Sequence, residues 1–247
     1  MRLLLINPNM TESMTRSMTD VARVTAGPAA EIVPLTATTG FPYISSRAEA
    51  QIAGAGVLET IASHRHDVDA VIIAAFGDPG LVAARELFDL PIVGMAEAAV
   101  MSAAMLGERF SVVTFSPHMA RWYDACVRQT GLGGRFTGVR CPADPPAQLG
   151  DVQTALRPEL IALAHDGTRS DGADVVILGG APLAGLAPQI AHETPGILVD
   201  PIAAATAQAM ALARLSPSYR NRTARPAAKT STGLGQALST VIAGETT

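Results

Sequence analysis

Apolar residues along this chain form short continuous runs, separated by longer segments with helical periodicity. The runs predict strands over 2–6, 31–35, 69–75, 91–94, 110–114, 135–139, 174–179 and 197–200. The segments between them predict helices over 11–24, 47–64, 79–88, 96–106, 118–130, 153–166, 183–192 and 201–214. Strands that are apolar on both faces and alternate with helices are typical of parallel sheets covered on both sides, so the pattern predicts an α/β fold.

The same order of strands, loops and helices occurs twice along the chain. The stretches VIIAAFGDPGL at 71–81 and VILGGAPLAGL at 176–186 share a strand, two small residues and a loop with Gly and Pro. In the same way, 3–9 corresponds to 111–117, and 91–99 to 197–205. The offset stays between 105 and 108 residues. This predicts two similar Rossmann-like lobes with parallel sheets, related by a pseudo-twofold axis, with an active site in the cleft between them.

We therefore expect a first α/β lobe over residues 1–95, with 201–214 packing back on it, and a second lobe over 96–200. Residues 215–247 read as a C-terminal extension that is partly flexible, because Ser, Thr, Pro, Gly and Arg replace the periodic apolar pattern. Within this extension only 235–243 predicts a short helix.

Composition argues against nucleic-acid-binding, membrane-spanning and disulfide-rich classes of protein. A net charge of −4 gives no basic surface for nucleic acid or anionic lipid. The apolar run at the N-terminus is short for a signal peptide, and we find no membrane-spanning stretch. Two cysteines are too few for a disulfide framework. We expect a cytoplasmic protein, a homo-oligomer, that acts on a small molecule and has neither nucleic acid nor a membrane as a partner.

The repeated corners are the candidate site. Ligands of doubly wound sheets lie beyond the carboxyl ends of the strands. Small residues at 74–75 and 179–180 allow a ligand to approach the backbone closely. Helices expected to begin near Asp78-Pro79 and Pro182-Leu183 would offer free N–H groups to a carboxylate or imide oxygen. This site includes Ala75, Phe76 and Gly77 at the first corner, and Gly180, Ala181 and Pro182 at the second.

On these residues the chain resembles the aspartate/glutamate/hydantoin racemase superfamily, most of all its hydantoin and allantoin racemase branch. The resemblance is carried by LLINPN at 4–9, DAVIIAAFGDPGL at 69–81, PIVGMAEAA at 91–99, FSVVT at 110–114 and GADVVILGGAPLAGLA at 172–187. It covers residues 1–214. It implies an enzyme without cofactor, in which a cysteine at each corner moves a proton to or from one face of a carbon beside a carbonyl.

This chain departs from that pattern at both corners. Ala75 and Gly180 stand where the family has its two cysteines. The resemblance therefore implies a racemase or isomerase acting on a small carbonyl, imide or carboxylate compound related to hydantoins or amino acids, with another source of acid/base chemistry. Two alternatives remain open: a cofactor-free lyase, decarboxylase or hydrolase on the same fold, and a non-catalytic small-molecule binder.

Asp78 and His118 are the candidate catalytic residues. Asp78 follows Gly77 and precedes Pro79, so it reads either as the N-cap of the helix after it or as a base in the cleft. His118 follows the strand at 110–114 and reads either as a surface or capping histidine or as a group for proton transfer, which its usual pKa suits. Cys126 reads as a buried structural cysteine away from both corners. No pattern of metal ligands is present, so we expect neither metal nor cofactor.

Polar residues at the ends of strands complete the expected site. Asn9 and Ser116 end the first strand of each half and are expected to contact the ligand, although Asn9 also reads as a helix N-cap. In PYISSRAEA at 42–50, Ser45 or Ser46 with Glu49 has the spacing of a capping box. Arg47 in the same stretch is placed either to clamp a substrate carboxylate or to form a surface ion pair.

Overall fold

The computed structural model describes residues 1–220, 222, 223 and 225–245, and contains two separate parallel sheets of four strands each. The first sheet has the order β2-β1-β3-β4 and the second the order β6-β5-β7-β8. The two orders are the same when each half is counted from its own start. The predicted α/β fold with two parallel sheets is therefore confirmed, and β3 and β7, which carry the repeated corner, hold the same place in their sheets.

The strands are short and their core residues are buried. Their bounds are β1 Arg2–Asn7, β2 Glu31–Thr36, β3 Ala70–Ile73, β4 Ile92–Gly94, β5 Phe110–Val113, β6 Phe136–Arg140, β7 Val175–Leu178 and β8 Ile197–Val199. The central strands β3 and β7 are buried along their whole length, as their continuous apolar runs require.

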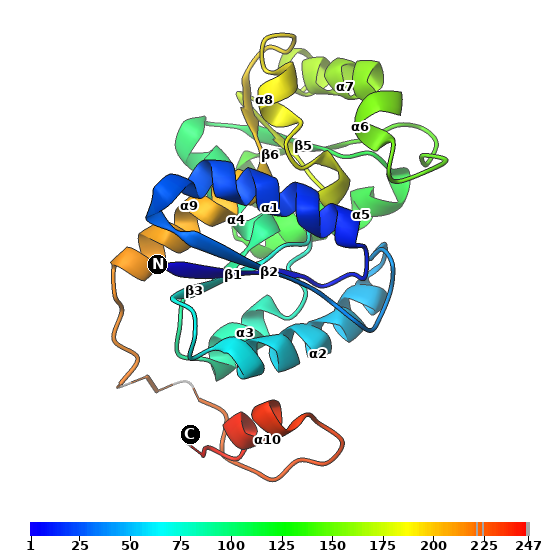
Figure 1. Cartoon of the computed structure of the whole chain (residues 1–247). Coiled ribbons are helices and arrows are strands. Elements are labelled where there is room, and N and C mark those ends of the chain that lie inside the picture. The colour runs from blue at the N-terminus through cyan, green and yellow to red at the C-terminus, as the bar shows by residue number, and fades with distance from the viewer. Residues whose placement is uncertain (221, 224, 246–247) are drawn as a thin grey trace.

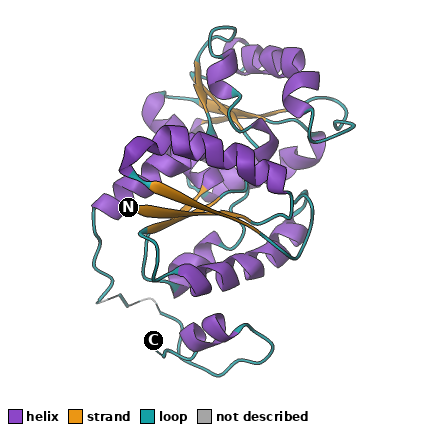
Figure 2. Cartoon of the chain, in the orientation of Figure 1, coloured by secondary structure: helices purple, strands orange, loops and turns teal. Residues whose placement is uncertain are grey.

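Helices cover both faces of the sheets (Figure 1; Figure 2). We call the chain up to the end of α4 the first half and the chain from β5 to α9 the second half. The helices of the first half are α1 Glu12–Ala26, α2 Arg47–His64, α3 Leu81–Leu87 and α4 Met95–Leu106. Those that follow are α5 Pro117–Gln129, α6 Val152–Ala155, α7 Arg157–Arg169, α8 Ala187–Ile190, α9 Pro201–Arg214 and α10 Gln236–Ile242. In Figure 1, α1 and α9 lie on one face of the first sheet, and α2 and α3 lie on the other.

Helix α9 links the two halves. It packs against α1, α4 and β3, and the Gln208 amide donates to the Ala98 carbonyl at 2.8 Å and to the Ser102 hydroxyl at 3.0 Å. The last helix of the second half therefore contributes to the core beside the first sheet. None of the helices formed by the described residues is long and apolar enough to cross a membrane.

Two helix predictions were wrong in detail. In place of the helix expected over 183–192, the chain forms a 3₁₀ turn over Ala181–Leu183 and then the four-residue α8. The helix is interrupted because Gly185 takes a φ of +83° and Pro188 follows. The segment 153–166 is divided into α6 and α7, with Leu156 outside helical geometry one residue before Arg157-Pro158.

The C-terminal segment returns to the first sheet's outer helices. Helix α10 packs on α2, with Leu238 3% exposed among the apolar side chains of α2 and α3 (Figure 1). Arg222 donates to the Phe88 carbonyl and forms an ion pair with Asp89. Residues 221, 224, 246 and 247 of the predicted extension lie outside the described residues.

Candidate functional site

The first corner follows β3 and is a tight turn rather than the start of a helix. The Asp78 N–H donates to the Ala75 carbonyl at 3.0 Å. Gly77 takes a φ of +128° and Asp78 one of +49°, which is unusual for a residue with a side chain. Helix α3 begins only at Leu81. The prediction that Asp78 caps this helix was therefore wrong.

Asp78 caps a different helix, the one that follows the neighbouring strand. Its two carboxylate oxygens accept the N–H groups of Ala96 and Glu97, each at 2.8 Å, at the N-terminus of α4. A Cβ at Gly94 would lie 2.3 Å from the Asp78 carboxyl carbon, so glycine is required there. Burial raises the pKa of the Asp78 carboxyl to about 7, although the two N–H donors act in the opposite direction.

At the second corner a carboxylate also joins the corner loop to a helix, but with the roles of loop and helix exchanged. Asp200, at the start of α9, accepts the N–H groups of Ile202 and Ala203 and also that of Gly185 in the loop after β7, at 2.6 Å. The carboxylate belongs here to the helix and not to the loop. Burial raises the pKa of Asp200 as well. In both halves a carboxylate, half-buried at Asp78 and buried at Asp200, joins the corner loop to the helix after the neighbouring strand.

The two corners meet at one small inner cavity between the halves. Of the residues predicted for the site, Asn9, Ala75, Phe76 and Ala181 line it. Four more residues line it that were not among the predicted site residues: Tyr43, Ile44, Trp122 and Tyr123. The cavity measures about 10 Å³, which is about the space of one water molecule. The site is therefore closed in this structure.

Aromatic side chains fill the space around the inner cavity. The Phe76 and Tyr123 rings lie 4.5 Å apart between centroids, and the Trp122 and Tyr123 rings 5.7 Å apart. The Tyr43 hydroxyl donates to the Met119 sulfur at 3.8 Å. Burial raises the pKa of Tyr43 and of Tyr123, so both are protonated at neutral pH. They can donate a hydrogen bond to a carbonyl oxygen, but they are not bases.

Gly180 has no room for a side chain. A Cβ at this position would lie 2.6 Å from the Phe115 ring and 3.5 Å from the Tyr123 hydroxyl oxygen, and the φ of +124° disfavours any other residue. Ala75, by contrast, already carries a Cβ at the wall of the cavity. The two corners are therefore unequal: position 75 has room for a side chain at the cavity wall, and position 180 has none.

Asn9 and Pro182 each accept a hydrogen bond from another residue of the protein. The Asn9 side-chain oxygen accepts the Thr11 N–H at 2.9 Å, which holds the turn between β1 and α1. The Pro182 carbonyl accepts the Gln153 amide at 2.9 Å. Pro182 lines neither the inner cavity nor the other cavity beside Gly77 and Asp78.

The polar residues of the second half contribute less than predicted. Ser116 is the N-cap of α5 and accepts the His118 N–H at 3.4 Å. His118 is exposed, and neither residue lines the inner cavity or the cavity beside Gly77 and Asp78. The geometry gives His118 no position from which to reach the inner cavity.

A second, more open cavity lies on the other side of Trp122. This outer pocket has a volume of about 210 Å³, and its walls include Arg47, Gln51, Gly77, Asp78, Cys126 and Gln129. Trp122 lines both cavities, and its ring lies against Gly77, where a Cβ would be 2.3 Å from the nearest ring atom. The Trp122 ring therefore divides the inner cavity from the outer pocket.

Cys126 was misplaced by the sequence, and Arg47 lines the same outer pocket. Cys126 was expected away from both corners, yet it shares the outer pocket with Gly77 and Asp78. Burial raises the pKa of its thiol to about 12, and the nearby Asp78 adds to this rise. Arg47 begins α2 directly after Ser46, whose hydroxyl accepts the Glu49 N–H as the capping-box spacing predicted. Its guanidinium donates to the Arg121 carbonyl at 2.9 Å and so bridges α2 and α5.

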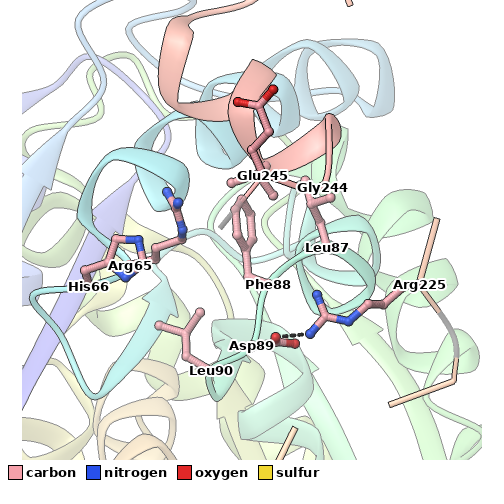
Figure 3. A pocket seen from close by; sticks show the side chains of 10 residues that line it. Arg65, His66, Leu87, Phe88, Asp89, Leu90, Arg225, Gly244 and Glu245 are labelled. Atoms are coloured by element: carbon pink, nitrogen blue, oxygen red, sulfur yellow. Dashed lines mark hydrogen bonds and ion pairs between the residues drawn. The ribbon is translucent and has the colours of Figure 1, made fainter. Parts of the chain in front are cut away.

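Two other cavities lie beside the C-terminal segment. One of about 280 Å³ is formed by Arg65 and His66, residues 87–90, and parts of the C-terminal segment (Figure 3). Residues 65–66 and 87–90 precede β3 and β4, so this cavity lies at the amino ends of these strands. The corner loops follow the carboxyl ends of strands, and the candidate site is therefore the inner cavity with its outer pocket.

Comparison with known proteins agrees with this arrangement. The family model for Asp/Glu/Hydantoin racemase matches residues 3–209. Hydantoin racemase of Paenarthrobacter aurescens is 31% identical over 217 residues, covering 87% of this chain and 92% of that protein. Hydantoin racemase of Pseudomonas sp. (strain NS671) is 33% identical over 208 residues, covering 83% of this chain and 82% of that protein.

Solved structures give the same result. Allantoin racemase from Klebsiella pneumoniae has a TM-score of 0.85 and 33% identity, covering 96% of this chain and 98% of that one. Allantoin racemase from Pseudomonas fluorescens has a TM-score of 0.88 and 33% identity, covering 94% and 100%. With a family match over residues 3–209 and relatives of this coverage, the chain belongs to the Asp/Glu/Hydantoin racemase family.

Proposed function

We propose that this protein is a cofactor-independent racemase or isomerase of a small cyclic imide or related carbonyl compound, of the hydantoin type. One observation carries the proposal: the two repeated corners bring Ala75 and Ala181 against one cavity, in a chain whose relatives over nearly its full length are hydantoin and allantoin racemases. The carbon–hydrogen bond beside the carbonyl of a hydantoin is acidic because the carbanion is delocalised onto oxygen. A site for it needs a base and donors to that oxygen.

The acid/base groups differ from a pair of thiols. Asp78 is the base in this proposal, because a pKa of about 7 leaves about half of its carboxyl ionised at neutral pH. The hydroxyls of Tyr43 and Tyr123 remain protonated and stabilise the enolate oxygen as donors. Asp78 takes the proton from one face of the carbon, and in this scheme a proton from solvent is added to the other face of the planar enolate. Trp122 and Gly77 lie between Asp78 and the inner cavity, so the substrate reaches Asp78 only after the Trp122 ring has moved.

The test follows loss of optical purity and exchange of the hydrogen at the stereocentre. Enantiopure 5-substituted hydantoins are incubated in D₂O with wild type, Asp78→Asn, or the control Asp20→Asn, which changes an exposed residue of α1. Chiral chromatography and proton NMR give both rates after subtraction of the spontaneous reaction. We expect Asp78→Asn to lose about 10²–10⁴-fold in rate, as removal of a general base does, and the control to keep its rate. Absence of enzymatic racemisation of every hydantoin would refute the proposal.

A second function is favoured by the inequality of the corners. Gly180 cannot present an acid across the cavity from Asp78, and a single acid/base group is sufficient for a cofactor-free decarboxylase or lyase. For this activity, mass spectrometry would show a substituted malonate losing carbon dioxide, with no racemisation of hydantoins. Binding of a hydantoin without either reaction would instead indicate a non-catalytic binder.

A further inference from the structure

A shallow groove beside the outer pocket gathers three arginines. We call it the arginine groove. It has a volume of about 630 Å³ and is formed by the start of α2, one side of α5 and strand β6. Its charged residues are Arg47, Arg121, Asp124 and Arg128. Because the whole chain carries a net charge of −4, three guanidinium groups beside a single carboxylate are a local excess of positive charge.

The protein itself uses few of the donors that these arginines offer. Among the described residues, the Arg121 guanidinium makes no hydrogen bond or ion pair, and that of Arg47 makes one hydrogen bond, to the Arg121 carbonyl at 2.9 Å. Arg128 forms two hydrogen bonds with the Asp124 carboxylate, at 2.7 Å and 3.1 Å. One of the three positive charges is therefore balanced by a carboxylate, and the charges of Arg47 and Arg121 are not.

The charges and the walls of the groove indicate the class of ligand that fits it. A guanidinium presents its N–H donors in a planar fork that matches the oxygens of a carboxylate or a phosphate. Two unbalanced arginines match a ligand with two negative charges. The uncharged walls include Ala120, Ala125 and Val139, whose small apolar side chains leave room for a short carbon skeleton.

The same walls argue against a nucleic acid. Proteins that bind single strands stack the bases on aromatic side chains, and none of the described residues that line the groove is aromatic. The net charge of −4 also repels a long polyanion. A small molecule with two charges avoids most of this repulsion, because it contacts only the groove.

We propose that the arginine groove is a binding site for a small oxyanion with two negative charges, a short dicarboxylate or a phosphate group, and that Arg47 and Arg121 are its main contacts. The site is separate from the two corners, since Arg121 and Arg128 line the groove but neither the outer pocket nor the inner cavity. It therefore does not depend on the reaction proposed above.

The experiment is calorimetric titration with inorganic phosphate and with succinate at pH 8, where both ions carry two negative charges, and with acetate as a singly charged control. The proteins are wild type, Arg121→Gln, Asp124→Asn and the matched control Arg169→Gln. Like Arg121, Arg169 is an exposed helix residue whose side chain has no partner among the described residues, and it lies outside the groove. Circular dichroism checks that each variant is folded.

We expect wild type to bind at least one of the two dianions, and acetate much more weakly. Arg121→Gln should weaken the binding about tenfold, because it removes a charge-assisted hydrogen bond. Asp124→Asn should strengthen it about threefold, because a negative charge leaves the groove and Arg128 is released toward the ligand. Arg169→Gln should match wild type. Added sodium chloride should weaken the binding by screening.

The opposite effects of Arg121→Gln and Asp124→Asn distinguish this groove from a general attraction of anions. Absence of saturable binding of both dianions to wild type would refute the proposal. So would an equal loss in Arg169→Gln and Arg121→Gln, or weaker binding in Asp124→Asn. A preference for phosphate would support the site and identify a phosphate group as its ligand, and a preference for succinate would support it with a dicarboxylate.

Discussion

The tie between Asp78 and helix α4 predicts an unusual dependence of stability on pH. In Asp78→Asn, the side chain keeps one oxygen for the N–H groups of Ala96 and Glu97 and turns an amide donor toward the other. One N–H at the N-terminus of α4 is then left without an acceptor. At pH 4 we expect this variant to be less stable than wild type by about 1–3 kcal/mol, the cost of one unsatisfied buried donor.

The sign of the pH effect follows from the raised pKa. Burial raises the pKa of Asp78 from 3.8 to about 7, so between these values the folded protein holds a proton that the unfolded chain has released. The free energy of unfolding must therefore fall as the pH rises through this window. Three units correspond to about 4 kcal/mol, and because Asp78 retains some exposure to solvent we expect about 2–4 kcal/mol.

The assay is urea unfolding, followed by circular dichroism, at intervals from pH 4 to pH 8. The quantity compared is the difference in the free energy of unfolding between wild type and Asp78→Asn, since contributions from other titrating groups cancel in it. The advantage of wild type at pH 4 should shrink as the pH rises, and it should vanish or reverse by pH 8. The control Asp20→Asn should show no such change.

A second variant, at Gly94, displaces the Asp78 carboxylate without changing Asp78 itself. Gly94→Ala places a Cβ where it would lie 2.3 Å from the Asp78 carboxyl carbon, so the carboxylate must leave α4. This variant should lose both stability and the pH dependence. A difference between wild type and Asp78→Asn that stays level, or that grows in favour of wild type with rising pH, would show that the two N–H donors outweigh burial and would refute the reasoning.

Three further predictions concern other parts of the molecule. Ala75→Cys should change the free energy of unfolding by less than about 1 kcal/mol. Gly180→Cys should lower it by about 3 kcal/mol or more, because of the φ of +124° and the nearby Phe115 ring. Equal stabilities of the two variants in urea would contradict this. Cys126, with a pKa of about 12, should react with iodoacetamide at pH 8 far more slowly than a free thiol, as peptide mass spectrometry can measure, and ligand binding should survive the treatment. Labelling at the rate of a free thiol would be the contrary result. Leu238→Ala should cost about 2–4 kcal/mol and expose residues 216–235 to proteolysis, and unchanged digestion would show that α10 is not docked in solution.

Much of the fold could be predicted because its signals are local. The continuous apolar runs of β3 and β7 mark buried parallel strands wherever they occur, and the repeat of 71–81 at 176–186 placed both in equivalent positions. The helix expected over 183–192 failed because Gly185 is held in a turn by Asp200, 15 residues further along the chain. A contact over that separation leaves no trace in hydrophobic periodicity.

The site was predicted only in part, for the same reason. Asn9, Ala75 and Ala181 lie at the ends of strands, where the rule for parallel sheets places ligands, and these residues do line the inner cavity. The aromatic walls come from α5 and from the loop before α2, and nothing in the sequence of α5 marks Trp122 and Tyr123 as part of the site. Tyr43 and Trp122 read locally as residues of a loop and of an amphipathic helix.

The sequence by itself determined the two parallel sheets, the repeated corners and the small residues Ala75 and Gly180 within them, since each of these is written in consecutive residues. The tertiary structure decided which helix Asp78 caps, which pocket Cys126 lines and how much space remains beside Gly180. Those features depend on the packing of elements that lie tens of residues apart, where differences of a few ångströms separate a closed cavity from an open pocket.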